Sequence, residues 1–110
     1  MIEIDEHPTG AAVLRVDGRL TMVDAPAFRS AVTEAVDGAA TTVVVDLSGC
    51  EFLDSSGLGA VIAGLKAARQ AGGDLRIAAP STQVLTVLQL TNLERVLRPF
   101  GSVAEALRAG

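Results

Sequence analysis

The sequence contains no tryptophan and no tyrosine, and it has only one cysteine and one histidine. With three phenylalanines as its only aromatic residues, the chain lacks the platform on which nucleic-acid bases stack. The single cysteine, Cys50, excludes an internal disulfide and fits a reducing compartment, and we expect it to be a small buried residue. The lone histidine, His7, has no cysteine near it, so we expect a turn residue and no metal site.

Positive charge is also scarce. Nine Lys and Arg stand against thirteen Asp and Glu, which gives a net charge of −4 and a pI of about 4.8. This balance argues against a basic nucleic-acid-binding surface, so no nucleic acid is expected as a partner. No uncharged apolar run approaches the ~20 residues of a membrane span, and the acidic residues at positions 3, 5 and 6 are unlike a signal peptide. These features predict a cytoplasmic protein without direct membrane insertion.

The first part of the sequence has the patterns of two β-strands. Apolar and acidic residues alternate over residues 2–5, and a second strand over 11–16 predicts a β-hairpin joined by a turn at 7–10. From Asp24, the expected N-cap, the apolar period becomes that of a helix, which Gly38 closes. The predicted core face of this helix consists of Phe28, Ala31, Val32, Ala35 and Val36.

The second half of the sequence alternates between strand and helix. Three consecutive valines within residues 41–47 predict a strand covered on both faces, as in a parallel sheet flanked by helices. The remaining elements are a helix with core positions from Leu58 to Ala68, a strand at 75–77, a helix from beyond Pro80 to Asn92, and a last helix from Ser102, where Glu105 completes a capping box.

This order of elements defines an α/β fold. The chain is 110 residues long, close to the commonest domain size, and 49% hydrophobic, so it can bury a core without metals or disulfides. We therefore predict one domain over residues 1–110, with an N-terminal β-hairpin, a small mixed sheet and about four helices.

Enzyme signatures are absent from the sequence. Gly57 and Gly59 would need a third glycine at the position of Ile62 to form a dinucleotide-binding fingerprint. There is no Gly-Lys-Ser/Thr phosphate loop, the Gly-x-Ser-x-Gly pattern fails around both serines of the 54–57 stretch, and no second histidine exists to act as a base. We therefore expect a protein that is not an enzyme and needs no cofactor.

The stretch of residues 51–59 lies between the strand at 41–47 and the helix that follows. Two adjacent hydroxyls, Ser55 and Ser56, fall where backbone N–H groups are unpaired and where negative charge is favoured. Serine is a favoured N-cap, so helix capping is one interpretation. Because one hydroxyl is enough for a cap, the second is left for another role, and phosphorylation is the other interpretation.

Glycines in the predicted helix also have two interpretations. Gly57, Gly59 and Gly64 each cost up to about 1 kcal/mol relative to alanine inside a helix, so something must offset that cost. Gly57 and Gly64 form a stripe of small residues together with Ala60 and Ala67, which favours tight packing within the chain. Alternatively, the glycines at 57 and 59 leave room for another protein to approach the hydroxyl.

Residues 46–48 (Asp-Leu-Ser) and 52–58 (Phe-Leu-Asp-Ser-Ser-Gly-Leu) resemble the signature of the STAS domain and, within it, of the bacterial anti-sigma-factor antagonists. Supporting matches are the Gly-Arg-Leu at 18–20 and the segment 93–107, so the resemblance covers essentially the whole chain. It implies a mixed sheet of four or five strands with helices packed mainly on one face.

The resemblance also implies partner switching. An antagonist of this family binds an anti-sigma factor that is also a serine kinase, and thereby frees a sigma factor for transcription. Phosphorylation of the second serine, here Ser56, releases the antagonist, and a serine phosphatase restores it. The implied partner- and kinase-binding residues are Thr21, Asp24, Asp54, Ser55, Gly57, Leu58 and Gly59.

One position departs from the family pattern. Many antagonists carry an aspartate directly after Gly-x-Leu, whereas this chain has Thr21, with Asp24 three residues further on. We expect this difference to concern kinase engagement and not the fold. A second function class stays open, in which the domain is a non-phosphorylated structural subunit that docks in a lipid- or anion-transport assembly and the serine is only a cap.

Overall fold

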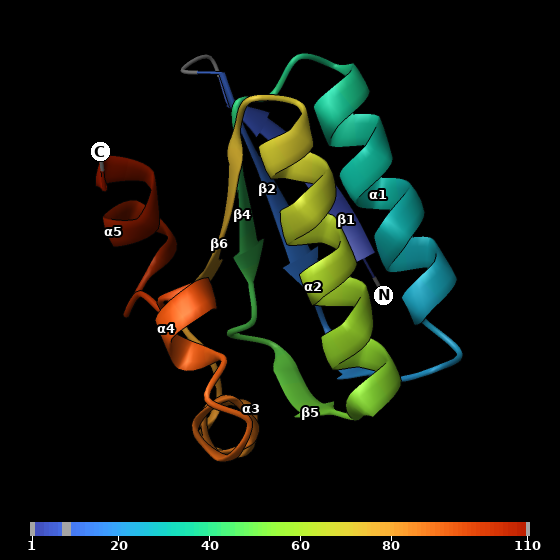
Figure 1. Cartoon of the computed structure of the whole chain (residues 1–110), viewed down its shortest axis with the longest axis vertical. Coiled ribbons are helices and arrows are strands. Elements are labelled where there is room, and N and C mark those ends of the chain that lie inside the picture. The colour runs from blue at the N-terminus through green and yellow to red at the C-terminus, as the bar shows by residue number, and fades with distance from the viewer. Residues whose placement is uncertain (1, 8–9, 110) are drawn as a thin grey trace.

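A four-stranded mixed sheet forms the centre of a computed structural model of the chain, which describes residues 2–7 and 10–109 (Figure 1). Its strands lie in the order β1 (Ile2–His7), β2 (Ala11–Val16), β4 (Thr42–Asp46) and β6 (Asp74–Ala78). β1 and β2 are antiparallel, which confirms the hairpin, and the other two pairings are parallel. His7, expected in the turn, is instead the last residue of β1 and pairs with Ala11, and residues 8 and 9 of the predicted turn lie outside the described residues.

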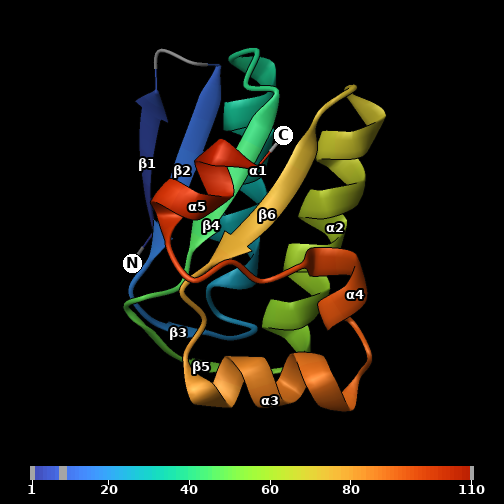
Figure 2. The ribbon, with the colours of Figure 1, turned by 90° about the vertical axis from the view of Figure 1, so that its left-hand side faces the viewer.

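Helices cover both faces of this sheet. α1 (Ala25–Asp37) and α2 (Ser55–Gln70) lie side by side on one face, and α5 (Val103–Arg108) lies across the other (Figures 1 and 2). α3 (Thr82–Leu90) and α4 (Glu94–Leu97) lie at one end of the molecule (Figure 2). The predicted α/β class and the placement of helices mainly on one face are confirmed, whereas the single-turn α4 was not predicted.

The main core fills the space between the sheet and the α1–α2 layer. Phe28 and Val32 of α1 are buried, as the helical period predicted, and so are Val61 and Leu65 of α2. The strand β4 is covered on both faces, as its three valines predicted. Val43 and Val45 face the main core, and Val44 lies in the smaller cluster under α5.

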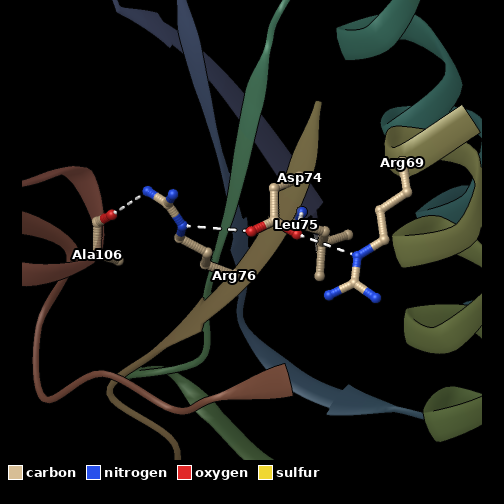
Figure 3. A network of polar contacts seen from close by, with 5 residues as sticks. All are labelled: Arg69, Asp74, Leu75, Arg76 and Ala106. Atoms are coloured by element: carbon tan, nitrogen blue, oxygen red, sulfur yellow. Dashed lines mark hydrogen bonds and ion pairs between the residues drawn. The ribbon is translucent and has the colours of Figure 1, made fainter. Parts of the chain in front are cut away.

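The face under α5 differs from the main core because it contains a buried arginine. Arg76 of β6 donates from Nη1 to the carbonyl oxygen of Ala106 at 2.9 Å (Figure 3). Its Nε lies 3.6 Å from the carboxylate of Asp74, which in turn lies 3.5 Å from Nε of Arg69 (Figure 3). Ala106 is in the last turn of α5, where carbonyls lack helical partners and cations are favoured, so Arg76 fastens the end of that helix to the sheet.

The start of α5 confirms the predicted capping box in a shifted form. Oγ of Ser102 accepts the N–H of Glu105 at 3.1 Å. The Glu105 carboxylate, however, accepts from the N–H of Gly101 at 3.1 Å, one residue earlier than the reciprocal bond of the standard motif.

A second, two-stranded sheet was not predicted. β3 (Gly18–Leu20) and β5 (Cys50–Leu53) pair in parallel below the main sheet (Figure 2). Cys50 is buried as expected, and burial raises the pKa of its thiol, which therefore stays protonated at neutral pH. β5 leads directly into the stretch that contains the two serines.

Candidate functional site

Asp54 is the residue that caps α2. Its backbone is extended, and its Oδ1 accepts the N–H of Gly57 at 2.7 Å. The helix begins at Ser55, three residues before the predicted apolar segment starts at Leu58. Both serines therefore lie in the first turn of α2, and the cap is supplied by the aspartate and not by either hydroxyl.

The hydroxyl groups of the two serines are accessible and make no hydrogen bond within the described residues. Ser55 is exposed and Ser56 is partly exposed. Neither hydroxyl makes a hydrogen bond to any of residues 2–7 and 10–109. The adjacent carboxylate of Asp54 accepts the backbone N–H groups of Met22 and Gly57 and makes no hydrogen bond to the Ser56 hydroxyl. The arrangement leaves the Ser56 hydroxyl available to another molecule.

Asp54 also ties the start of α2 to a distant loop. Its second oxygen, Oδ2, accepts the N–H of Met22 at 3.3 Å across 32 residues of sequence. This loop, residues 21–24, joins β3 to α1 and carries two exposed apolar side chains, Met22 at 71% and Val23 at 82% exposure. Apolar residues exposed to this extent beside a free hydroxyl are suited to contact with another protein.

Met22 and Val23 were not among the residues predicted to bind a partner. Their signal was weak: two apolar residues stand before Asp24, outside the helical period that begins there. Apolar residues in a loop indicate a contact surface only when their exposure is known, and the sequence does not give exposure.

Thr21 and Asp24 close the same loop. The carbonyl oxygen of Thr21 accepts the N–H groups of Asp24 at 3.0 Å and of Ala25 at 2.9 Å, which makes a tight turn before α1. Asp24 occupies the N-cap position, but its backbone is helical and its side chain makes no capping hydrogen bond. The prediction that Asp24 caps this helix was therefore right in position and wrong in mechanism.

The glycines of α2 divide between the two interpretations. A Cβ on Gly57 would overlap the carbonyl oxygen of Leu20, and one on Gly64 would lie 3.1 Å from the Leu75 side chain. Packing within the chain accounts for both. A Cβ on Gly59 would meet nothing within 4 Å, and this residue is exposed. Gly59 is thus the glycine that leaves open space, while Gly57 and Leu58 are buried in the chain itself.

A side chain from α3 holds the strand that precedes the serines. Oε1 of Gln83 accepts the N–H of Leu53 at 3.0 Å, and its Nε2 donates to the Leu53 carbonyl at 3.2 Å. Across the strand pair, the guanidinium of Arg19 in β3 lies 4.7 Å from the centre of the ring of Phe52, its partner in β5. No sequence pattern indicates this role of Gln83, because its partner is the backbone of a residue 30 positions away.

The described residues contain neither a candidate metal site nor a candidate membrane-spanning helix. Among residues 2–7 and 10–109, no group of three or more His, Cys, Asp or Glu side chains could hold a metal ion. Within the same ranges, no helix is both long enough and apolar enough to cross a membrane.

Comparison with known proteins identifies the family. The family model described as "Mlab, STAS domain" matches residues 5–99. The chain therefore belongs to the STAS domain family, as the motif at residues 52–58 had indicated.

Similar proteins include named antagonists. The anti-sigma-F factor antagonist RsfB of Mycobacterium tuberculosis is 29% identical over 96% of this chain and 85% of its own length. The anti-sigma F factor antagonist of Paenibacillus polymyxa is 26% identical over 93% of this chain and 88% of its own length. Shorter matches also occur: one to a Thermotoga neapolitana protein has 34% identity over 65 residues and spans 58% of that protein.

The fold is shared with a solved structure of a cell fate determinant. SpoIIAA of Bacillus, in its phosphorylated form, superposes with a TM-score of 0.77 at 23% identity, covering 97% of this chain and 96% of that chain. At this identity the likeness concerns the fold.

Proposed function

We propose that this chain is an anti-sigma-factor antagonist that is switched off by phosphorylation of Ser56. It binds an anti-sigma factor that is also a serine kinase, and so frees a sigma factor; a serine phosphatase reverses the modification. The kinase supplies ATP, which places the reaction in the cytoplasm. The observation that carries the proposal is the unbonded, partly exposed Ser56 hydroxyl, beside a loop with exposed Met22 and Val23.

The position of Ser56 makes a phosphate tolerable to the fold. Phosphorylation adds roughly −1.5 to −2 charges at neutral pH. At the N-terminus of α2 the helix dipole favours that charge by about 0.3–1 kcal/mol, while the Asp54 carboxylate at the same helix start opposes it. These contributions roughly offset each other, so the domain stays folded.

The same charge is costly in an interface. When a partner covers the 21–24 loop and the start of α2, it also covers a phosphate on Ser56. Burying an unpaired charge costs several kcal/mol, and each ~1.4 kcal/mol is tenfold in affinity. Phosphorylation should therefore act on binding far more than on stability.

Two further observations support the proposal. The relatives from Mycobacterium tuberculosis and Paenibacillus polymyxa are named as antagonists, and SpoIIAA has been solved in a phosphorylated form. In addition, the docking-subunit alternative gave the serine only a capping role. Here Asp54 is the cap, so that alternative leaves both hydroxyls without a function.

The test begins with the kinase that adds one phosphate to the purified chain, detected as a mass shift. Ser56→Ala should abolish labelling and still bind, whereas Ser55→Ala should be labelled as the wild type is. Ser56→Asp should bind the kinase partner about tenfold or more weakly than the unphosphorylated wild-type chain does, with little change in melting temperature. Equal binding by Ser56→Asp and wild type would refute the proposal, and labelling lost only in Ser55→Ala would move the site to Ser55.

A further inference from the structure

The side chain of Gln83 hydrogen-bonds the backbone of β5 in the way that a neighbouring strand would. β5 pairs with β3 along one edge, and at its other edge lies α3 (Figure 2). There the carboxamide of Gln83 receives the N–H of Leu53 at 3.0 Å and donates to its C=O at 3.2 Å. An amide side chain used in this way reproduces the paired bonds that a neighbouring strand exchanges with one residue.

Leu53 is the junction on which the start of α2 depends. On its β3 side it is paired with Leu20, and the next residue, Asp54, donates its N–H to the Leu20 carbonyl at 3.3 Å. The same carbonyl packs so closely on Gly57 that no side chain fits there. The peptide groups of Leu53 are therefore held from both sides, by β3 and by α3, immediately before the turn that carries the serines.

Gln83 is itself held firmly. It lies in the first turn of α3, whose N-cap Ser81 accepts the N–H of Val84 at 3.3 Å, and Val84 is buried in the main core. Its side chain is partly buried, and its two bonds are the ones to Leu53. A side chain anchored in this way transmits the position of α3 to the backbone of β5.

We propose that Gln83 is a positioning residue, which fixes the backbone of Leu53 and thereby sets where the Ser56 hydroxyl stands relative to the 21–24 loop. The inference rests on the proposed phosphorylation of Ser56. Phosphoryl transfer depends on alignment of the attacking hydroxyl, and a displacement of about 1 Å can cost 10²-fold in rate. A kinase that docks on the loop and transfers to Ser56 needs the two at a fixed separation.

The test uses two variants with matched controls on the same helix. Gln83→Met keeps the approximate length of the side chain and removes both hydrogen bonds. Gln83→Glu keeps the acceptor for the Leu53 N–H and loses the donor to its C=O at neutral pH. Gln89→Met and Gln89→Glu make the same chemical changes at an exposed position of α3 whose side chain makes no hydrogen bond to the part of the chain described here.

The first measurement needs no kinase. Amide hydrogen exchange at Leu53 and at Gly57, whose N–H bonds to Asp54 beside Ser56, should be about tenfold faster in Gln83→Met and unchanged in both Gln89 variants, as followed by NMR. A protonated carboxyl has one donor and one acceptor, as an amide does. Lowering the pH to about 4 should therefore return the Leu53 and Ser56 amide shifts of Gln83→Glu toward those of the wild type at the same pH, and should not do so in Gln83→Met.

The second measurement is the rate of phosphorylation. In Gln83→Met, kcat should fall by about tenfold while KM changes much less, because alignment is lost and the docking loop is retained. Faster exchange with unchanged kcat would show a purely structural role and overturn the inference, as would unchanged exchange. If the wild-type chain is not phosphorylated at Ser56 at all, the proposed function fails, and the exchange data then establish Gln83 only as part of the fold.

Discussion

The starts of α1 and α2 match position for position and behave differently. Each has an aspartate at the N-cap, Asp24 or Asp54, and each follows a strand of the small sheet. Asp54 accepts two backbone N–H groups, one of them from a distant loop, while Asp24 makes no capping bond. The proposed switch lies at the start where the cap also makes a long-range contact.

Backbone geometry explains the difference. Asp54 follows β5 and has an extended backbone, so its side chain points back over the first turn of α2. Asp24 lies in a tight turn, and its own backbone angles are helical. In addition, Pro26 stands at the second position of α1 and has no N–H for a cap to accept. The matching position in α2 is Ser56, which keeps its N–H and adds a hydroxyl.

The largest effect is expected at the third helical position, which is Gly57 in α2 and Ala27 in α1. Gly57→Ala should lower the free energy of unfolding by about 2–4 kcal/mol, because the new methyl group would overlap the carbonyl oxygen of Leu20. Urea denaturation with comparison of midpoints at equal m-values measures this loss.

The reverse change in α1 provides the control. Ala27 is exposed, so Ala27→Gly should cost no more than about 1 kcal/mol, the difference in helix propensity. Equal losses in the two variants would mean that the contact between Gly57 and Leu20 does not constrain the start of α2.

The sequence predicted the elements whose cause is local and missed those whose cause is not. The helical period around Phe28, the three valines of β4 and the Ser102 cap were sufficient for α1, β4 and α5. The short strands β3 and β5 exist only because they pair with each other, and their sequences carry no period of their own.

The same distinction holds within the site. The position of the serines at a helix start was predictable from residues 54–57, because caps follow local rules. The contacts of Asp54 with Met22 and of Gln83 with Leu53, in contrast, join chain segments about 30 residues apart. Such contacts follow from the tertiary fold, so no local sequence pattern predicts them.

A smaller effect is expected from removing each aspartate. Asp54→Ala should destabilise the protein by about 1 kcal/mol, within the 0.5–2 kcal/mol range of lost N-caps, because the Gly57 N–H loses its acceptor. Asp24→Ala should change stability by less than about 0.5 kcal/mol, since no capping bond is lost. Thermal and urea unfolding of both variants measures the difference.

The amide of Met22 separates the two roles of Asp54. Its hydrogen exchange should accelerate in Asp54→Ala and stay unchanged in Asp24→Ala, because only Asp54 accepts that N–H. If Asp24→Ala proved as destabilising as Asp54→Ala, the contrast between the two helix starts would be lost.

The smallest effect is expected at the fifth helical position, where α1 has Arg29 and α2 has Gly59. Because a Cβ at Gly59 meets nothing, Gly59→Ala should stabilise the protein by about 0.5–1 kcal/mol through helix propensity and a less flexible unfolded chain. The glycine therefore costs stability for which nothing within the described chain compensates. If the open space serves the approach of the kinase, the same variant should bind that partner more weakly although it is more stable. Opposite changes in stability and binding would distinguish a residue kept for a partner from one kept for packing, as Gly57 is; unchanged binding would leave Gly59 outside the interface.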